Sequence, residues 1–280
     1  MPVLRLKESS IYYEINGKAK RTLFFIHGFT CDHSDWNFQV QQLSNAYRVV
    51  TCDLRGHGLS TGDESGFTIE ALAGDISLLF KALGIQQTVL IGHSMGCRVA
   101  LETYLQNPRT IAGIVLIDGN NLSQGNTTGI GEAKRRTIEK QGYTEYIKST
   151  FAGMFFGDSN VKMKDRIIER ALKLDPKFGI NLLSNAPEWD SAKIEVALSE
   201  LKVPLLVLQS TGYSANYERI SLKKGDTTPW LQLVNKLVPS AKIKIMSGYG
   251  HFVMLEAPDA ISKLINSFAS GLKNIELHNT

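Results

Sequence analysis

The chain has 280 residues, of which 43% are hydrophobic, enough for one large core with a small inserted subdomain. Its 31 basic and 27 acidic residues are scattered, so the net charge of +4 does not indicate a nucleic-acid partner. No apolar run approaches the roughly 18 residues of a membrane span, and the start MPVLRLKESS lacks the pattern of a signal peptide. We therefore expect a cytoplasmic protein without a nucleic-acid or membrane partner.

Short, continuously apolar segments alternate with segments of helical periodicity along most of the chain. Strands are predicted at 3–10, 11–17, 22–28, 47–53, 88–93, 113–118, 204–210 and 241–247. Helices are predicted at 68–83, at 95–108, from Thr228–Pro229 to just before Pro239, and after Pro258. This alternation is typical of a mostly parallel sheet that is covered by helices on both faces.

Residues 119–200 interrupt the alternation. They contain amphipathic patterns such as EAKRRTIEKQG and VKMKDRIIERALKL and no convincing strand. We interpret them as a helical cap inserted into a core domain that consists of residues 1–118 and 201–280.

The strongest chemical signal is Gly92-His93-Ser94-Met95-Gly96, between an apolar strand and a helix. A serine on such a sharp turn adopts strained backbone torsions, and only small neighbours fit around it. The turn presents the hydroxyl beside the N-terminus of the helix, where the N–H of Met95 can bind a developing oxyanion. We interpret Ser94 as a nucleophile; the alternative is a glycine-rich packing turn.

Two further loops are predicted to reach the same edge of the sheet. The loop HGFT (27–30) can supply a second oxyanion donor, the N–H of Phe29, whereas His27 fits a structural role. The loop GYGHF (248–252) carries His251, a candidate general base because the ordinary pKa of histidine, ~6.5, suits proton transfer near neutral pH. The alternative for His251 is a hydrogen-bonded structural histidine.

Together, the stretches HGFT, DLRGHGLS (53–60), GHSMG and GYGHF resemble the α/β-hydrolase superfamily over nearly the whole chain. The resemblance implies an eight-stranded sheet with a helical cap after the sixth strand, and a triad in the order serine, acid, histidine. It also implies that DLRGHGLS is a structural turn in which Arg55 and His57 hold loops together.

The acid departs from the family's commoner pattern. Most relatives carry Gly-x-x-Asp at the end of the seventh strand, whereas here the strand 204–210 is followed by no acid before Glu218. Asp118 ends the strand 113–118 and reaches the same edge as Ser94, where ligand sites of open α/β sheets form. We predict Asp118 as the acid, as in certain haloalkane dehalogenases and lactonases, with Asp226 and Glu218 as alternatives. Asp118 can also be read as a loop cap.

Several aromatic residues are candidates for the substrate pocket, although a core between cap and sheet explains them equally well. These residues are Trp36, Phe151, Phe155 and Trp189. The three cysteines are few and irregularly spaced, which argues against a disulfide framework or a zinc site. No metal and no organic cofactor are implied.

The sequence thus predicts a serine hydrolase that cleaves a carboxylic ester or lactone of a small to medium apolar substrate through an acyl-enzyme. A serine nucleophile argues against dehalogenase and epoxide hydrolase chemistry. The alternatives are a cofactor-free dioxygenase or carbon–carbon hydrolase of the same superfamily, and a receptor-like binding protein with vestigial activity.

Overall fold

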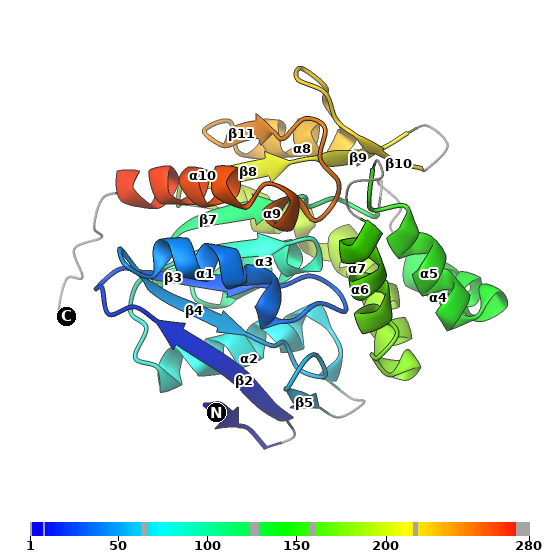
Figure 1. Ribbon diagram of the computed structural model, residues 1–280, viewed down its shortest axis with the longest axis horizontal. Coiled ribbons are helices and arrows are strands. Elements are labelled where there is room, and N and C mark those ends of the chain that lie inside the picture. Colours follow the sequence, from blue (N-terminus) through cyan, green and yellow to red (C-terminus); the bar gives the residue numbers. More distant parts are fainter. Residues whose placement is uncertain are drawn as a thin grey trace.

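A computed structural model describes residues 2–7, 9–62, 66–123, 129–156, 161–214 and 218–272. A twisted sheet forms its centre (Figure 1). The strands of this sheet are β1 (Val3–Arg5), β2 (Ser9–Asn16), β3 (Thr22–Ile26), β4 (Arg48–Cys52), β5 (Thr61–Gly62), β6 (Thr88–His93), β7 (Ile111–Ile117), β8 (Leu205–Gln209) and β11 (Lys242–Ile245).

The strand order confirms the predicted fold class. The order is β1-β2-β4-β3-β6-β7-β8-β11, and the short β5 pairs with β2 beside this path. All pairs from β4 through β3 to β11 are parallel, whereas β2 pairs antiparallel with β1, β4 and β5. The carboxyl ends of β3, β6, β7, β8 and β11 therefore share one edge, where the predicted site residues follow the strands.

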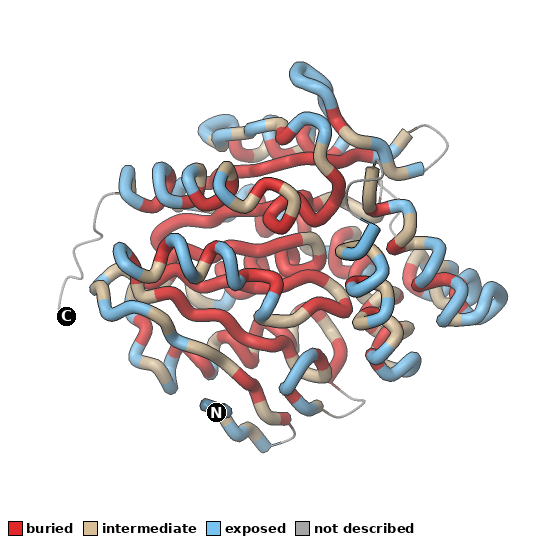
Figure 2. Tube along the Cα trace, in the orientation of Figure 1, coloured by how far each residue is buried: buried red, intermediate tan, exposed pale blue. Residues whose placement is uncertain are grey.

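Helices cover both faces of the sheet. They are α1 (Asn37–Leu43), α2 (Ile69–Ala82), α3 (Met95–Gln106), α8 (Pro229–Leu237), α9 (Val253–Glu256) and α10 (Pro258–Gly271), with a 3₁₀ turn at His33–Trp36. Phe24 and Ile26 of β3 pack with α2, α3 and α8, whereas Leu23 and Phe25 pack with α1 and α10. Burial on both faces explains why the central strands are continuously apolar, and Figure 2 shows them as the buried centre.

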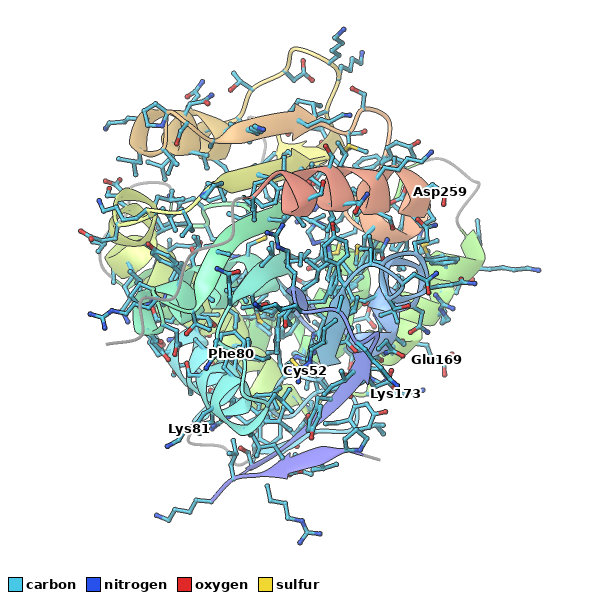
Figure 3. All side chains as sticks on the ribbon, turned by 90° about the vertical axis from the view of Figure 1, so that its left-hand side faces the viewer. Cys52, Phe80, Lys81, Glu169, Lys173 and Asp259 are labelled. Carbon is cyan, nitrogen blue, oxygen red and sulfur yellow. The ribbon has the colours of Figure 1, made fainter. Side chains whose placement is uncertain are left out.

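Side-chain placement follows the same division between interior and surface (Figure 3). Cys52 and Phe80 are buried, whereas Lys81, Glu169 and Lys173 are exposed. Among the described helices, none combines the length and the apolarity that a membrane crossing requires.

Between β7 and β8, the described residues form four helices at one end of the sheet: α4 (Ile130–Gln141), α5 (Tyr143–Ala152), α6 (Val161–Ala171) and α7 (Pro176–Ser199). α4 and α6 follow the two amphipathic patterns quoted above. The 24-residue α7 was not predicted, because Gly179 and Pro187 interrupt its helical signal. No strand occurs in the described part of 119–200, as expected, and the division into core and cap stays a prediction.

A short hairpin follows β8 where the sequence indicated only a polar loop. It consists of β9 (Thr211–Tyr213) and β10 (Arg219–Ser221), which pair antiparallel. Three-residue strands carry too little periodicity to be recognised from sequence. The hairpin brings new side chains to the carboxyl edge of the sheet.

Candidate active site

Ser94 lies on the tight turn between β6 and α3, with φ 54° and ψ −117°. A Cβ added at Gly92 would lie 2.3 Å from the carbonyl oxygen of Gly96, and one added at Gly96 would lie 2.4 Å from that of Ile26. Side chains at these two positions would therefore collide with the backbone of the turn and of β3. The glycines are required by close packing, as the motif predicts.

The structure brings Ser94, His251 and Asp118 into one hydrogen-bonded series. The imidazole Nε2 of His251 lies 2.8 Å from Oγ of Ser94, and its Nδ1 lies 2.6 Å from Oδ2 of Asp118. Asp118 and His251 are buried, at 1% and 2% exposure. The alternative acids, Glu218 and Asp226, are both exposed, and Asp226 accepts a hydrogen bond from the backbone of Lys223 in a local turn.

Most relatives carry the acid after the strand that corresponds to β8. In this chain, the residues at that position donate hydrogen bonds to Asp118 instead. Oδ1 of Asp118 accepts from the backbone N–H groups of Ser210 (2.8 Å) and Thr211 (2.7 Å), and Oδ2 accepts from Oγ1 of Thr211 at 2.5 Å. Burial alone would raise the pKa of Asp118, but the hydrogen bond from His251 and the charge of Arg219 lower it to about 2. Asp118 therefore stays ionised at every pH at which the protein is expected to work.

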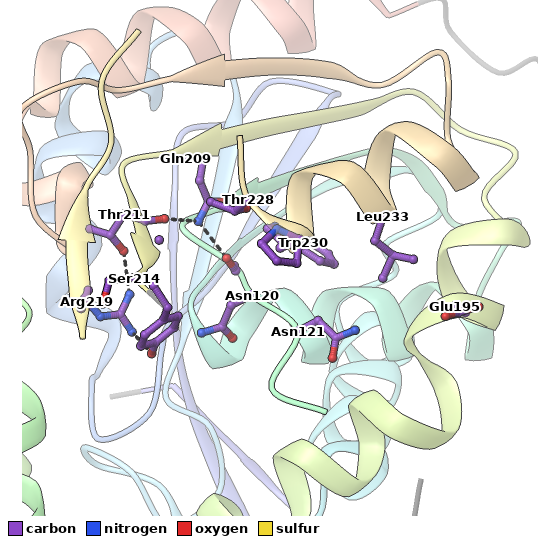
Figure 4. A pocket seen from close by; sticks show the side chains of 14 residues that line it. Asn120, Asn121, Glu195, Gln209, Thr211, Ser214, Arg219, Thr228, Trp230 and Leu233 are labelled. Atoms are coloured by element: carbon purple, nitrogen blue, oxygen red, sulfur yellow. Dashed lines mark hydrogen bonds between the residues drawn. The ribbon is translucent and has the colours of Figure 1, made fainter. Parts of the chain in front are cut away.

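Arg219, on β10, places a guanidinium beside this carboxylate, and Figure 4 shows it next to Thr211. Its Nη1 donates to Oγ1 of Thr211 at 2.6 Å and lies 3.5 Å from Oδ2 of Asp118 and 3.2 Å from Nδ1 of His251. Its Nη2 donates to the hydroxyl of Tyr213 at 2.7 Å. Sequence reasoning missed Arg219, because no motif marks it and the hairpin that positions it was not predicted.

Burial and the charge of Arg219 together lower the pKa of His251 to about 4, against the opposing effect of Asp118. His251 is therefore neutral near pH 7. A neutral imidazole that donates from Nδ1 to Asp118 has its Nε2 lone pair free to accept the Ser94 proton.

Other histidines hold the loops of this edge in place. Nε2 of His93 donates to the carbonyl oxygen of His251 at 2.8 Å, which ties the histidine loop to the nucleophile strand. His27 bridges the backbones of Gly28 (2.7 Å) and Leu54 (2.9 Å), in agreement with its expected structural role. His93 belongs to the GHSMG motif, yet its contact with a distant loop left no signal in the sequence.

The turn DLRGHGLS also makes structural contacts. Arg55 forms two hydrogen bonds of 2.7 Å with Asp75 of α2, and Nδ1 of His57 lies 3.0 Å from the carbonyl oxygen of Arg55. Arg55 thus ties the loop to α2, and His57 makes a contact within the loop; both contacts are structural, as the resemblance implies.

A cavity of about 110 Å³ opens onto Ser94 and is called the Ser94 cavity below. Phe29 and Met95, the predicted oxyanion donors, both line it, and Met95 is the first residue of α3, where backbone N–H groups have no partner within the helix. Gly28 lies so close to Ser94 that an added Cβ would be 3.1 Å from the serine Cβ. The oxyanion role of Phe29 and Met95 stays a prediction.

Of the four predicted pocket residues, Phe151 lines the Ser94 cavity. Phe155 is not among the lining residues but stacks on Phe252, which is, with ring centroids 5.3 Å apart. The prediction that Trp36 and Trp189 line the pocket is wrong, because both lie in the core. Trp36 packs on Phe25 of β3, and the indole N–H of Trp189 donates to Glu102 at 2.9 Å. Large aromatic side chains fill cores as readily as pockets, so their type alone did not separate the two roles.

A larger cavity of about 670 Å³ adjoins the Ser94 cavity and shares Asn120, Tyr213 and Arg219 with it (Figure 4). Neither Ser94 nor His251 lines this larger cavity. The smaller one is therefore where the hydrogen-bonded series can act on a bound molecule.

Comparison with known proteins gives a match between residues 23–264 and the model of the alpha/beta hydrolase family. The dihydrolipoyllysine-residue acetyltransferase component of the acetoin cleaving system of Cupriavidus necator is 33% identical over 130 residues, which are 45% of this chain and 35% of that protein. The human protein ABHD8 is 25% identical over 256 residues, 90% of this chain and 55% of that protein. The chain thus spans about a third to a half of the length of these relatives.

Among solved structures, the enol-lactonase of Burkholderia xenovorans LB400 superposes with a TM-score of 0.79 and 21% identity, covering 96% of this chain and 100% of that one. Est816, an N-acyl homoserine lactone degrading enzyme, gives a TM-score of 0.78 and 22% identity, covering 95% and 100%. At these identities the likeness is one of fold.

Proposed function

This chain belongs to the alpha/beta hydrolase family, and we propose that it is a serine hydrolase that cleaves carboxylic esters or lactones. The observation that carries the proposal is the hydrogen-bonded series of Ser94, His251 and Asp118, of which Ser94 and His251 line a cavity. Serine, base and buried acid are the groups that acyl transfer needs, in the connectivity it needs.

In the first half-reaction, Oγ of Ser94 attacks the carbonyl carbon while Nε2 of His251 takes the hydroxyl proton. The oxyanion of the tetrahedral intermediate is held by the N–H groups of Phe29 and Met95. The bond from carbon to the leaving oxygen then breaks, and that oxygen takes the proton from His251. With a lactone, the released hydroxyl stays attached to the acyl group.

In the second half-reaction, His251 takes a proton from water, whose oxygen attacks the acyl-enzyme carbonyl. The bond to Oγ breaks, and Ser94 recovers its proton from His251, so an acid is released and the enzyme is regenerated. Asp118 keeps its charge throughout and stabilises the imidazolium that forms in each half-reaction.

The direct test is labelling with a fluorophosphonate, followed by turnover of p-nitrophenyl esters and of lactones. We expect stoichiometric labelling and ester or lactone hydrolysis. Absence of both would contradict the proposal and favour a binding protein, and turnover that stops without oxygen would favour a dioxygenase.

The low pKa of His251, about 4, predicts the pH range of the activity. Only the neutral imidazole accepts the serine proton, so kcat/KM should rise with a midpoint near pH 4 and not near 6.5. Arg219→Met removes a positive charge and should raise the pKa of His251, moving the midpoint upward by about one pH unit. Initial rates from pH 3 to 8 measure both midpoints.

Arg219→Lys is the matched control, because it keeps a positive charge and should leave the midpoint close to that of the wild type. The other charged or titratable groups near His251 are unchanged in both variants; they are Asp118, Arg98 and His93. A midpoint that stays in place in Arg219→Met would show that the charge of Arg219 does not contribute to the low pKa of His251.

A further inference from the structure

Arg98, one turn after Ser94 on α3, carries a guanidinium nitrogen that makes no hydrogen bond with the described residues. The side chain is buried, at 4% exposure, and lines the Ser94 cavity. Its Nε and Nη2 bind the two carboxylate oxygens of Asp190 at 2.8 and 2.6 Å, and Nη2 also donates to Oδ1 of Asn120 at 2.8 Å. In the described parts of the chain, Nη1 has no hydrogen-bond partner, although a guanidinium nitrogen of this kind carries two donors.

Lys134, on α4, brings a second cation to the same cavity. Its ammonium lies 4.8 Å from the ring centroid of Tyr146, another lining residue, so the aromatic face steadies it by a cation–π contact. No carboxylate within the described ranges lies at ion-pair distance from Lys134, whereas Lys148 and Lys193 are paired with Glu145 and Glu70.

The lining of the Ser94 cavity is therefore positively charged. Arg98, Lys134 and Arg219 contribute to it, and no Asp or Glu is among its described lining residues. The negative charge of Asp190 balances the positive charge of Arg98, and that of Asp118 balances Arg219. Among the described lining residues, the charge of Lys134 is therefore left unbalanced. Apolar neighbours such as Phe151 and Leu182 exclude water and strengthen the attraction of these cations for an anion.

We propose that Arg98 and Lys134 form a carboxylate subsite and that the substrate is a short ester or lactone carrying a free carboxylate. The proposal rests on the proposed hydrolase function and names its substrate class. Arg98 follows Ser94 by four residues and both line the Ser94 cavity, so a substrate with its ester carbonyl at Ser94 can place a nearby carboxylate at Arg98. The small volume of the cavity, about 110 Å³, favours a short chain between the two groups, as in the half-esters of short dicarboxylic acids.

The test compares two chromogenic esters of similar shape, p-nitrophenyl hemisuccinate and p-nitrophenyl 4-methylpentanoate, in which an isopropyl group replaces the carboxylate. We expect the wild type to prefer the hemisuccinate in kcat/KM by about tenfold or more, the scale of one charge-assisted contact. Lys134→Met should lower this preference by about tenfold, mainly through KM.

Lys140→Met is the matched control, because Lys140 is exposed on the same helix and does not line the cavity; it should leave both rates unchanged. Arg98→Lys keeps the charge opposite Asp190 but loses the fork geometry, and it too should lower the preference. Arg98→Met would leave the buried Asp190 without its cationic partner, so folding is checked by thermal melting before the kinetics of this variant are compared.

The outcomes separate the subsite from the hydrolase function. Hydrolysis of the neutral ester at the same rate as the hemisuccinate, or faster, would overturn the subsite and leave the hydrolase intact. Absence of all ester turnover, with succinate still raising the melting temperature of the wild type but not of Lys134→Met, would support the subsite and overturn the hydrolase.

Discussion

Replacement of Ser94 by alanine is expected to abolish fluorophosphonate labelling and to lower ester turnover by about 10⁶, because the hydroxyl is the atom that forms the acyl-enzyme. The fold should survive. The variant removes one oxygen at the cavity wall, and alanine meets the same backbone strain as serine at φ 54°. Intact-protein mass spectrometry after labelling and initial rates on p-nitrophenyl esters measure the two effects.

Ser262→Ala is a matched control for this variant. Ser262 is a buried serine of α10, at 3% exposure, and it lies outside the Ser94 cavity, so labelling and turnover should match the wild type. Labelling that persists in Ser94→Ala would require another nucleophile. The thiols nearest the site are poor candidates, since burial raises the pKa of Cys97 to about 12 and that of Cys31 well above its ordinary value.

The central part of the fold was predictable because its signals are local. Continuous apolar runs mark the strands of a doubly covered sheet, and caps mark helix starts: Thr68 and Thr228 accept hydrogen bonds from the backbone N–H groups of Ala71 and Leu231. Ser94 and His251 were predictable for a related reason. A nucleophile turn and a base loop need glycines at fixed spacings, and these spacings are visible in the sequence.

Asp118 was predictable from topology rather than from a motif. Neighbouring parallel strands end at one edge, so an acid at the end of β7 must emerge beside a nucleophile at the end of β6. Arg219 and Arg98 had no such signal. The position of Arg219 depends on a hairpin of three-residue strands. The position of Arg98 depends on Asp190, which is 92 residues away in α7. Contacts of this kind are set by tertiary packing and leave no periodicity.

Asp118→Asn is expected to lower kcat by up to ~10⁴ while leaving the fold intact. The reason lies in the hydrogen bonds of the carboxylate. The backbone N–H groups of Ser210 and Thr211 both donate to Oδ1, so the oxygen of an asparagine amide must occupy that position. Its NH₂ group then faces Nδ1 of His251, and the imidazole must carry its proton on Nε2 instead. In that tautomer His251 cannot accept the proton of Ser94.

Steady-state kinetics on one ester, with thermal melting as a check on folding, measures this effect. Asp226→Asn and Glu218→Gln serve as controls, because both side chains are exposed, and they should keep kcat within about twofold of the wild type. A well-folded Asp118→Asn with nearly wild-type kcat would show that the carboxylate is not the group that orients His251. Loss of activity in Glu218→Gln would instead indicate that the carboxylate of Glu218 reaches His251 during turnover.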